Sequence, residues 1–309
     1  MPRRYVIRPV SFTSGGSAIA GRLYIPVGVD MPCPCVVFAH GFSGTMDWIL
    51  PDFADVFAHR GLAVLLFDYR HFGMSGGQPR QLVDSHRQRE DIRAALAFAR
   101  TCPDIDADRV ALWGTSLGGS HVVTVAAGDA RVAAVVANVP ALDMYSGLRG
   151  RFRSATFRPG AGRTLVATAR LVVCAAADAV RGRVGCPPHY LAVYGPLGRA
   201  VFSDPALASN FHELETRSPT WRNQVTPRFL LHAPRYRNGT LQRLPCPVLI
   251  TLARDDAAVS TPFVRRKSSG AANVSLKEYP VGHFDMYHGA VRDQVARDQR
   301  DFLLRVLCH

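Results

Sequence analysis

The residue with the clearest potential for chemistry in this sequence is Ser116. It lies in the pentapeptide 114–118, Gly-Thr-Ser-Leu-Gly, which fits the pattern G-x-S-x-G. An apolar run over residues 109–113 predicts a strand before it, and a small-residue helical pattern follows it. A strand that turns directly into a helix holds the turn residue in strained backbone and leaves its hydroxyl exposed. Glycine and serine also meet in turns by chance, but these flanking elements predict that Ser116 is a nucleophile.

A serine hydroxyl needs a base that accepts its proton, and His283 is the best placed of the histidines. It follows the last predicted strand, residues 274–279. Loops at the carboxyl ends of parallel strands meet over one crevice, which would bring His283 to Ser116. The other histidines fall in predicted helices, turns, an inserted segment or the chain end, where a base fits less well. We expect one of them, His40, to hold its own loop by hydrogen bonds.

Three aspartates could orient this histidine. Asp255 and Asp256 follow the predicted strand 248–252, and because they are adjacent only one of them can face His283. We favour Asp256, and the alternative for Asp255 is a surface charge or a cap of the following turn. Asp143, which follows the predicted strand 132–137, is a third candidate, because some serine hydrolases take their acid from that position.

Two backbone amides could bind the negative charge that develops on a substrate carbonyl oxygen. The amide of Leu117 lies at the start of the helix after Ser116, where amide groups point toward an anion. The amide of Phe42 lies in the loop after the predicted strand 35–39, where His40-Gly41 leaves the backbone free to turn inward. We expect Phe42 and Leu117 to form the oxyanion hole.

The order of predicted elements indicates the fold that must position these groups. After an N-terminal hairpin, strands and helices alternate, which is typical of an α/β protein with a mostly parallel, doubly wound sheet. The alternation stops over residues 140–244, which are too many for a loop, and resumes afterwards. We therefore predict a core of residues 1–139 and 245–309 with a mainly helical cap, residues 140–244, over the carboxyl ends of the strands.

The sequence carries a formal net charge of +13, and part of the excess is concentrated in the predicted cap. Residues 148–200 contain nine arginines and a single acid, Asp178. Such a segment attracts anionic partners, although a solvated basic surface is an equal alternative. Nucleic acid is a weaker candidate, since no known reader motif accompanies the charge. The arginines are Arg149, Arg151, Arg153, Arg158, Arg163, Arg170, Arg181, Arg183 and Arg199.

The remaining composition indicates an ordinary cytoplasmic enzyme without a metal. The seven cysteines are scattered and form no Cys-x-x-Cys pair, so we expect free thiols in a reducing compartment. The N-terminal residues contain no apolar signal core, and the longest apolar region, residues 164–180, is broken by Arg170 and Asp178. We therefore predict no secretion, no membrane span, no metal and no cofactor.

Several motifs together resemble the α/β-hydrolase superfamily. They are His-Gly-Phe at 40–42, Asp-Tyr-Arg-x-Phe-Gly-x-Ser-Gly-Gly at 68–77, the Ser116 pentapeptide and Gly-His-Phe-Asp at 282–285. The ending Gly-His-Phe-Asp-Met-Tyr, Val-Thr-Pro-Arg-Phe at 225–229 and Asn138 are similar to a bacterial and fungal branch. This branch includes polyketide acyltransferases and thioester hydrolases. Two residues depart from the pattern, because His71 and Ala253 stand where many relatives have glycine.

These observations predict a serine esterase, thioesterase or acyltransferase that acts on a small-molecule acyl ester or thioester. The catalytic residues would be Ser116, Asp256 and His283, and the cap arginines could dock an acyl carrier protein or a coenzyme A thioester. The alternative keeps the fold and the same three residues for a carbon–carbon hydrolase, lyase or cyclase in a biosynthetic pathway. We expect aromatic residues of the cap to shape the substrate pocket, namely Tyr145, Phe152, Tyr190, Tyr194 and Trp221.

Overall fold

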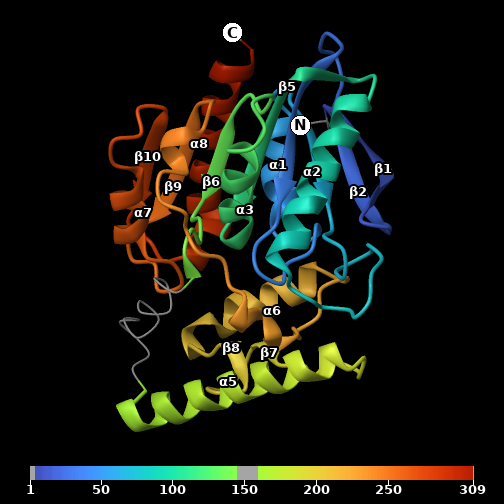
Figure 1. Ribbon diagram of the computed structural model, residues 1–309. Helices are drawn as coiled ribbons and strands as arrows, with labels where there is room; N and C mark the ends of the chain where they lie inside the picture. The colour runs from blue at the N-terminus through green and yellow to red at the C-terminus, as the bar shows by residue number, and fades with distance from the viewer. Residues whose placement is uncertain (1–3, 145–158, 309) are drawn as a thin grey trace.

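The computed structural model describes residues 4–144 and 159–308 and is built on an eight-stranded sheet (Figure 1). The strand order is β1-β2-β4-β3-β5-β6-β9-β10. Strands β1 (Tyr5–Ser14) and β2 (Ser17–Pro26) form an antiparallel hairpin, and β2 also pairs antiparallel with β4 (Ala63–Phe67). All other pairs are parallel and join β3 (Cys33–Ala39), β5 (Ile105–Thr115), β6 (Val135–Asn138), β9 (Val248–Ala253) and β10 (Val274–Tyr279). The predicted α/β fold with a mostly parallel sheet is confirmed.

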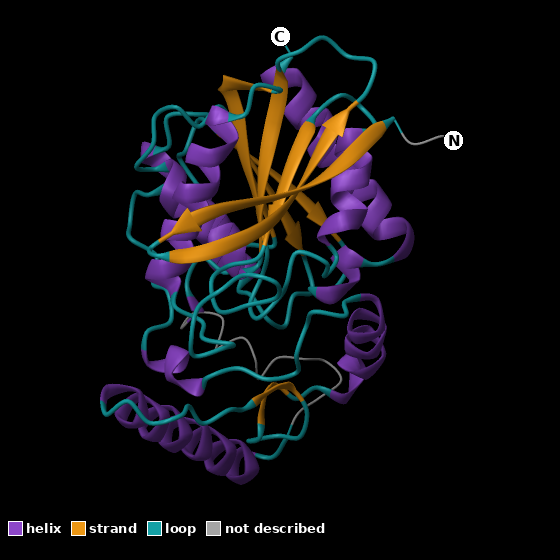
Figure 2. Ribbon diagram, turned by 90° about the vertical axis from the view of Figure 1, so that its right-hand side faces the viewer, coloured by secondary structure: helices purple, strands orange, loops and turns teal. Residues whose placement is uncertain are grey.

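Helices cover both faces of this sheet (Figure 2). Helix α1 (Leu50–Ala58) packs with α8 (Gly289–Leu307), and α2 (Ser85–Thr101) packs with α3 (Leu117–Ala126) on the opposite face. Helix α7 (Thr261–Ser268) connects β9 to β10. Every residue of β3 and β4 is buried, which explains why these strands read as continuous apolar runs in the sequence.

The described chain between β6 and β9, residues 139–144 and 159–247, lies beyond the carboxyl ends of the parallel strands (Figure 1), and we call it the cap. Its longest element is α5 (Ala161–Arg183), followed by the two short parallel strands β7 (Ala192–Tyr194) and β8 (Ala200–Phe202). Helix α6 (Ala208–Arg217) and three short 3₁₀ helices, η2 (Pro205–Leu207), η3 (Pro227–Leu231) and η4 (Leu241–Arg243), complete it. The cap therefore covers the end of the sheet at which Ser116 lies.

Several element boundaries differ from the sequence predictions. Strand β5 begins at Ile105 rather than residue 109, because it continues to pair with β3 across a shift in register near Cys33. Strand β6 begins at Val135 rather than residue 132. The last helix begins at Gly289, after a separate 3₁₀ helix, η5 (Phe284–Tyr287). All seven cysteines are free thiols, and none of the helices in the described parts of the chain is long and apolar enough to cross a membrane.

Candidate active site

Ser116 stands at the turn between β5 and α3, in backbone that few residues adopt. Its φ is 52° and its ψ is −116°, and its amide donates to the carbonyl of Asn138 at 2.9 Å. The turn requires glycine on both sides, since a Cβ at Gly114 would lie 2.4 Å from the Gly118 carbonyl oxygen. A Cβ at Gly118 would lie 2.3 Å from the Ala39 carbonyl oxygen. The G-x-S-x-G pattern is therefore explained by the close crossing of β5, α3 and the end of β3.

A small cavity of about 40 Å³ opens beside Ser116 and is also lined by Phe42 and Leu117. Neither the Phe42 amide nor the Leu117 amide donates a hydrogen bond to another residue in the described chain. Phe42 lies in the loop after β3 and Leu117 lies in the first turn of α3, as the sequence predicts. The arrangement leaves two donors available at the edge of the Ser116 cavity.

The structure brings His283 and Asp256 into direct contact. Nδ1 of His283 lies 2.7 Å from Oδ2 of Asp256, and their side chains are only 5% and 1% exposed. The other carboxylate oxygen of Asp256 accepts from the amides of Ala258 at 2.8 Å and Val259 at 2.7 Å. The loop after β9 thus fixes the orientation of the carboxylate, and the carboxylate fixes the orientation of the imidazole.

The two alternative acids lie in different surroundings. The Asp255 side chain is 65% exposed and lies 3.8 Å from a guanidinium nitrogen of Arg254. Asp143 lines the Ser116 cavity, and one of its carboxylate oxygens accepts from the amide of Tyr236 at 3.2 Å. Of these three aspartates, Asp256 is the one with a hydrogen bond to His283.

A hydrogen bond ties the loop of His283 to the turn of Ser116. The Tyr287 hydroxyl, in η5 after His283, lies 2.7 Å from the Thr115 hydroxyl, which belongs to the residue before Ser116. The Tyr287 ring also packs edge-on against the His283 ring, with centroids 5.9 Å apart. Burial raises the pKa of Tyr287, so this hydroxyl stays protonated. Ala258 and Val259, which hold Asp256, line the same cavity as Ser116. These contacts place the three side chains at one end of the sheet.

A buried polar network lies directly under these contacts. Asn138 donates to the Thr115 hydroxyl at 3.1 Å and accepts from Thr251 at 2.7 Å. Gln299 of α8 donates to Asn138 at 3.1 Å and to Thr251 at 2.9 Å, and it accepts from the indole of Trp113 at 2.8 Å. The network joins the ends of β5, β6 and β9, the strands that lead to Ser116, Asp143 and Asp256. Because its groups are buried, it favours one relative position of these strands.

His40, the residue that follows β3, is fully buried at the start of the loop that carries Phe42. Its Nε2 lies 3.4 Å from the amide nitrogen of Tyr69, and its Nδ1 lies 3.1 Å from the carbonyl oxygen of Gly41. Burial lowers the pKa of His40 to about 4, so the imidazole is neutral at pH 7. The expectation that His40 holds its loop by hydrogen bonds agrees with these contacts.

Aromatic side chains from the cap and the core pack above the Ser116 cavity. Phe202 of β8 lines this cavity and contacts Phe42 at a centroid distance of 6.1 Å and Phe284 at 5.7 Å. Phe42 also packs against Phe229 of η3 at 4.6 Å. The rest of the wall is apolar apart from Asp143, and it includes Ala141, Met144, Val201, Ala258 and Val259.

Three of the five aromatic residues that the sequence suggests for the pocket, Tyr190, Tyr194 and Trp221, do not line this cavity. Tyr194 stacks on Phe211 at 4.8 Å, and Phe211 in turn contacts Phe202. The Trp221 indole donates to the carbonyl of Ser43 at 2.9 Å, and the Tyr190 hydroxyl donates to the carbonyl of Arg80 at 3.1 Å. Trp221 and Tyr190 therefore attach the cap to the core, whereas Tyr194 packs within the cap. The other two candidates, Tyr145 and Phe152, lie outside the described residues.

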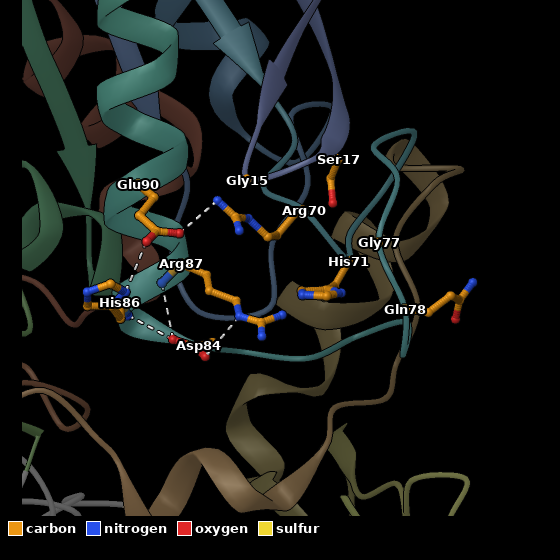
Figure 3. Close-up of a pocket in the computed structure, with 10 residues that line it drawn as sticks. All are labelled: Gly15, Ser17, Arg70, His71, Gly77, Gln78, Asp84, His86, Arg87 and Glu90. Atoms are coloured by element: carbon orange, nitrogen blue, oxygen red, sulfur yellow. Dashed lines mark hydrogen bonds and ion pairs between the residues drawn. The ribbon is translucent and has the colours of Figure 1, made fainter. Parts of the chain in front are cut away.

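A separate cavity of about 560 Å³ surrounds His71 (Figure 3). His71 has a φ of 76°, the left-handed region that favours glycine, and Gly77 packs against its ring. Burial and nearby arginines lower the pKa of His71 to about 4. The cations around this cavity are paired, Arg70 with Asp91 and Glu90, and Arg87 with Asp84. This cavity shares no lining residue with the Ser116 cavity. The histidine that replaces glycine at position 71 therefore does not change the walls of the Ser116 cavity.

Sequence reasoning missed the apolar wall of the Ser116 cavity. Val201 and Phe202 belong to a strand of only three residues, which leaves no periodic pattern. Phe42 was singled out for its amide, although its ring contacts two cap residues, Phe202 and Phe229. The role of the Phe42 ring could have been inferred from the sequence, because Phe42 is a large apolar residue in a loop that the cap is expected to cover.

The family of the chain follows from its match to known proteins. The profile of the family described as serine aminopeptidase, S33, matches residues 30–292, which include all three candidate catalytic residues. The chain belongs to this family of α/β hydrolases. In the α/β-hydrolase fold the nucleophile lies on a sharp strand-to-helix turn, and the acid and the histidine follow it in chain order.

Relatives of this α/β hydrolase match over nearly its whole length. It is 36% identical over 300 residues to the quorum-quenching protein AidA of Acinetobacter baumannii, covering 96% of this chain and 94% of the relative. It is 30% identical over 310 residues to the polyketide transferase ATR5 of Stachybotrys chlorohalonatus, covering 96% and 95%. The crystal structure of the α/β hydrolase GrgF from a Penicillium species has a TM-score of 0.77 at 24% identity, covering 98% of this chain and all (100%) of that one. The protein is thus an α/β-hydrolase enzyme, and one of its relatives is named a polyketide transferase.

Proposed function

We propose that this protein is a serine esterase, thioesterase or acyltransferase that works through an acyl-enzyme. The observation that carries the proposal is the His283–Asp256 pair at 2.7 Å, tied through Tyr287 and Thr115 to the turn of Ser116. An imidazole oriented by a buried carboxylate beside a strained serine is the arrangement that activates a hydroxyl.

The reaction would run in two halves. In the first, Ser116 Oγ attacks the carbonyl carbon while His283 takes its proton, and His283 then gives this proton to the leaving alcohol or thiol. Asp256 keeps Nδ1 of His283 protonated and stabilises the imidazolium. The amides of Phe42 and Leu117 donate to the oxyanion, and one such donor is typically worth about a hundredfold or more in rate. In the second half, water or another alcohol attacks the acyl-enzyme carbonyl while His283 takes its proton. His283 then returns this proton to Ser116 Oγ as the bond between Oγ and the acyl carbon breaks, which releases the acid or the new ester.

Two observations favour acyl groups as the substrate class. Apart from Asp143, the wall of the Ser116 cavity is apolar, which suits the hydrocarbon part of an acyl group. Among the relatives, one is named a polyketide transferase, and a thiohydrolase of Aspergillus aculeatus is 38% identical over 131 residues. An acidic carrier protein could approach through exposed cap arginines such as Arg163 and Arg170 on α5.

A product assay tests the proposal. Purified protein would be given p-nitrophenyl esters and a panel of acyl thioesters, with and without alcohol acceptors, beside Ser116→Ala. We expect release of alcohol or thiol by the native protein, and a loss of at least about a thousandfold in the variant. Turnover of none of these substrates, with a product from carbon–carbon cleavage, elimination or cyclisation instead, would reject acyl transfer.

The role of the cap arginines is tested by salt. If Arg163, Arg170 and their neighbours on α5 attract an acidic carrier protein, affinity for the acyl-carrier substrate should fall steeply with ionic strength. A flat response from about 50 to about 500 mM salt would reject this attraction.

A further inference from the structure

A large basic pocket lies between the core and the cap, with a volume of about 830 Å³. We call it the arginine pocket. Six arginines and two histidines line it, against a single acid, Asp84. The volume falls in the range of about 300–1,000 Å³ that is typical of pockets for small molecules. The arginines are Arg87, Arg89 and Arg93 of α2, and Arg228, Arg235 and Arg237 of the cap.

Three of these arginines lie outside the ion pairs that the described residues form. Arg89 and Arg93 stand one turn apart on α2, and Arg237 faces them from the cap. None of the three forms an ion pair with an acid in the described chain. Burial, together with the charges of Arg93 and Arg237, lowers the pKa of Arg89. Three guanidinium groups that repel one another around a cavity form a site that an anion would stabilise.

Two other arginines of the pocket, Arg228 and Arg87, are already paired with acids. Arg228 makes a hydrogen-bonded ion pair with the buried Asp178 at 2.6 Å, and Arg87 lies 3.6 Å from Asp84. Asp84 also caps α2 by accepting from the amides of His86 and Arg87. Asp84 therefore already has partners, and although its charge also acts on Arg89, one carboxylate does not balance the charges of Arg89, Arg93 and Arg237. This distinguishes the arginine pocket from the cavity at His71, whose cations are balanced (Figure 3).

The arginine pocket adjoins the cavity of Ser116. Leu142 lines the pocket, while its neighbours Ala141 and Asp143 line the Ser116 cavity. Ser120, one turn after Ser116 on α3, lines the pocket, and so does Phe229, whose ring packs on Phe42. The cap segment that carries the arginines is bonded to the same place, because the Tyr236 amide donates to Asp143. A ligand in the pocket could therefore extend its reactive end toward Ser116.

We propose that the arginine pocket binds the phosphate groups on the leaving-group side of the acyl donor, and that the donor is a coenzyme A thioester. The inference rests on the proposed function, and it adds a substrate class. Guanidinium groups bind phosphate oxygens through paired N–H donors, and several free guanidinium groups match a ligand with several phosphates. Phosphopantetheine on a carrier protein offers the same chemistry with a single phosphate, and the experiment separates the two sources.

The test measures binding rather than turnover, so it is independent of whether Ser116 performs acyl chemistry. Calorimetry at low salt would compare coenzyme A with pantetheine, which lacks the phosphates, on the full chain carrying Ser116→Ala. We expect coenzyme A to bind at least about tenfold more tightly than pantetheine. Adding Arg89→Ala with Arg93→Ala should weaken coenzyme A at least about tenfold and leave pantetheine unchanged.

The matched control is Arg163→Ala with Arg170→Ala, which removes the same charge from the exposed face of α5. It should change the affinity for coenzyme A by less than about twofold. Thermal unfolding would check that each variant is folded, and Arg237→Gln in the cap loop provides an independent site variant.

Three results would overturn the proposal. The first is equal binding of coenzyme A and pantetheine. The second is an equal loss of coenzyme A affinity in the pocket and control variants. The third is arginine-dependent binding of a holo-carrier protein without any binding of coenzyme A, which would assign the pocket to the carrier-bound cofactor instead.

Discussion

Nδ1 of His283 lies 2.7 Å from Oδ2 of Asp256, and both side chains are almost fully buried. This pair predicts that replacing Asp256 lowers kcat far more than replacing the adjacent Asp255. Asp256→Asn should lower kcat by up to about ten-thousandfold, because an amide no longer holds the required tautomer of His283. Steady-state kinetics on a p-nitrophenyl ester would measure it.

The control is Asp255→Asn, which changes an exposed carboxylate next door and should alter kcat by less than about twofold. Equal losses in the two variants, or a larger loss at Asp255, would show that the acid has been misassigned.

The buried network under the site predicts a cost in stability. Gln299→Met keeps most of the volume but leaves the Trp113 indole without its acceptor and removes one of the donors to Asn138. The free energy of unfolding in urea should fall by about 1–3 kcal/mol. Gln294→Met, on the exposed face of the same helix, should change it by less than about 0.5 kcal/mol. Equal stability of both variants would mean that the network does not hold the strands together.

The crossing at Gly118 predicts a packing defect. Gly118→Ala would place a Cβ 2.3 Å from the Ala39 carbonyl oxygen, so β3 or α3 must move. We expect a loss of about 1–3 kcal/mol in the free energy of unfolding, together with a loss of esterase activity. At Gly128 the nearest atom to an added Cβ is 3.7 Å away, and Gly128→Ala should be tolerated. Native stability and activity in Gly118→Ala would contradict the described turn.

Buried histidines predict that stability falls in acid. Burial lowers the pKa of His121 from 6.5 to about 3, so the unfolded chain binds this proton at a higher pH than the folded protein does. Between about pH 6 and about pH 4, His121 should therefore cost about 1.4 kcal/mol of stability per unit of decreasing pH.

His121→Gln, which can still bond Gln88, should remove this contribution. Urea unfolding at several pH values would compare its slope with that of the native protein, in which His40 and Asp68 titrate as well. Identical slopes would show that His121 is not buried as a neutral group.

Much of the core could be predicted because its signals are local. The buried strands β3 and β4 are apolar throughout, and β10 was predicted with the bounds that the structure has. His283 and Asp256 could be expected to meet because each follows one of two neighbouring parallel strands. The topology of the sheet converts such distant sequence positions into neighbours.

The cap could not be predicted in this way. Its strands β7 and β8 have three residues each, and its aromatic side chains meet only in the folded chain. Tyr194 and Trp221 were reasonable candidates for the pocket, but Phe202 and Phe211 stand between them and the Ser116 cavity. The arginine pocket shows the same limit, since α2 and the segment 228–237 are far apart in the sequence.

The central claim, that Ser116 is the nucleophile, is tested most directly by labelling with a phosphonate ester and mapping the modified peptide by mass spectrometry. We predict a single adduct on Ser116, no adduct in Ser116→Ala, and labelling slowed by at least about a hundredfold in His283→Ala. An adduct on another residue, or undiminished ester turnover in Ser116→Ala, would contradict the account.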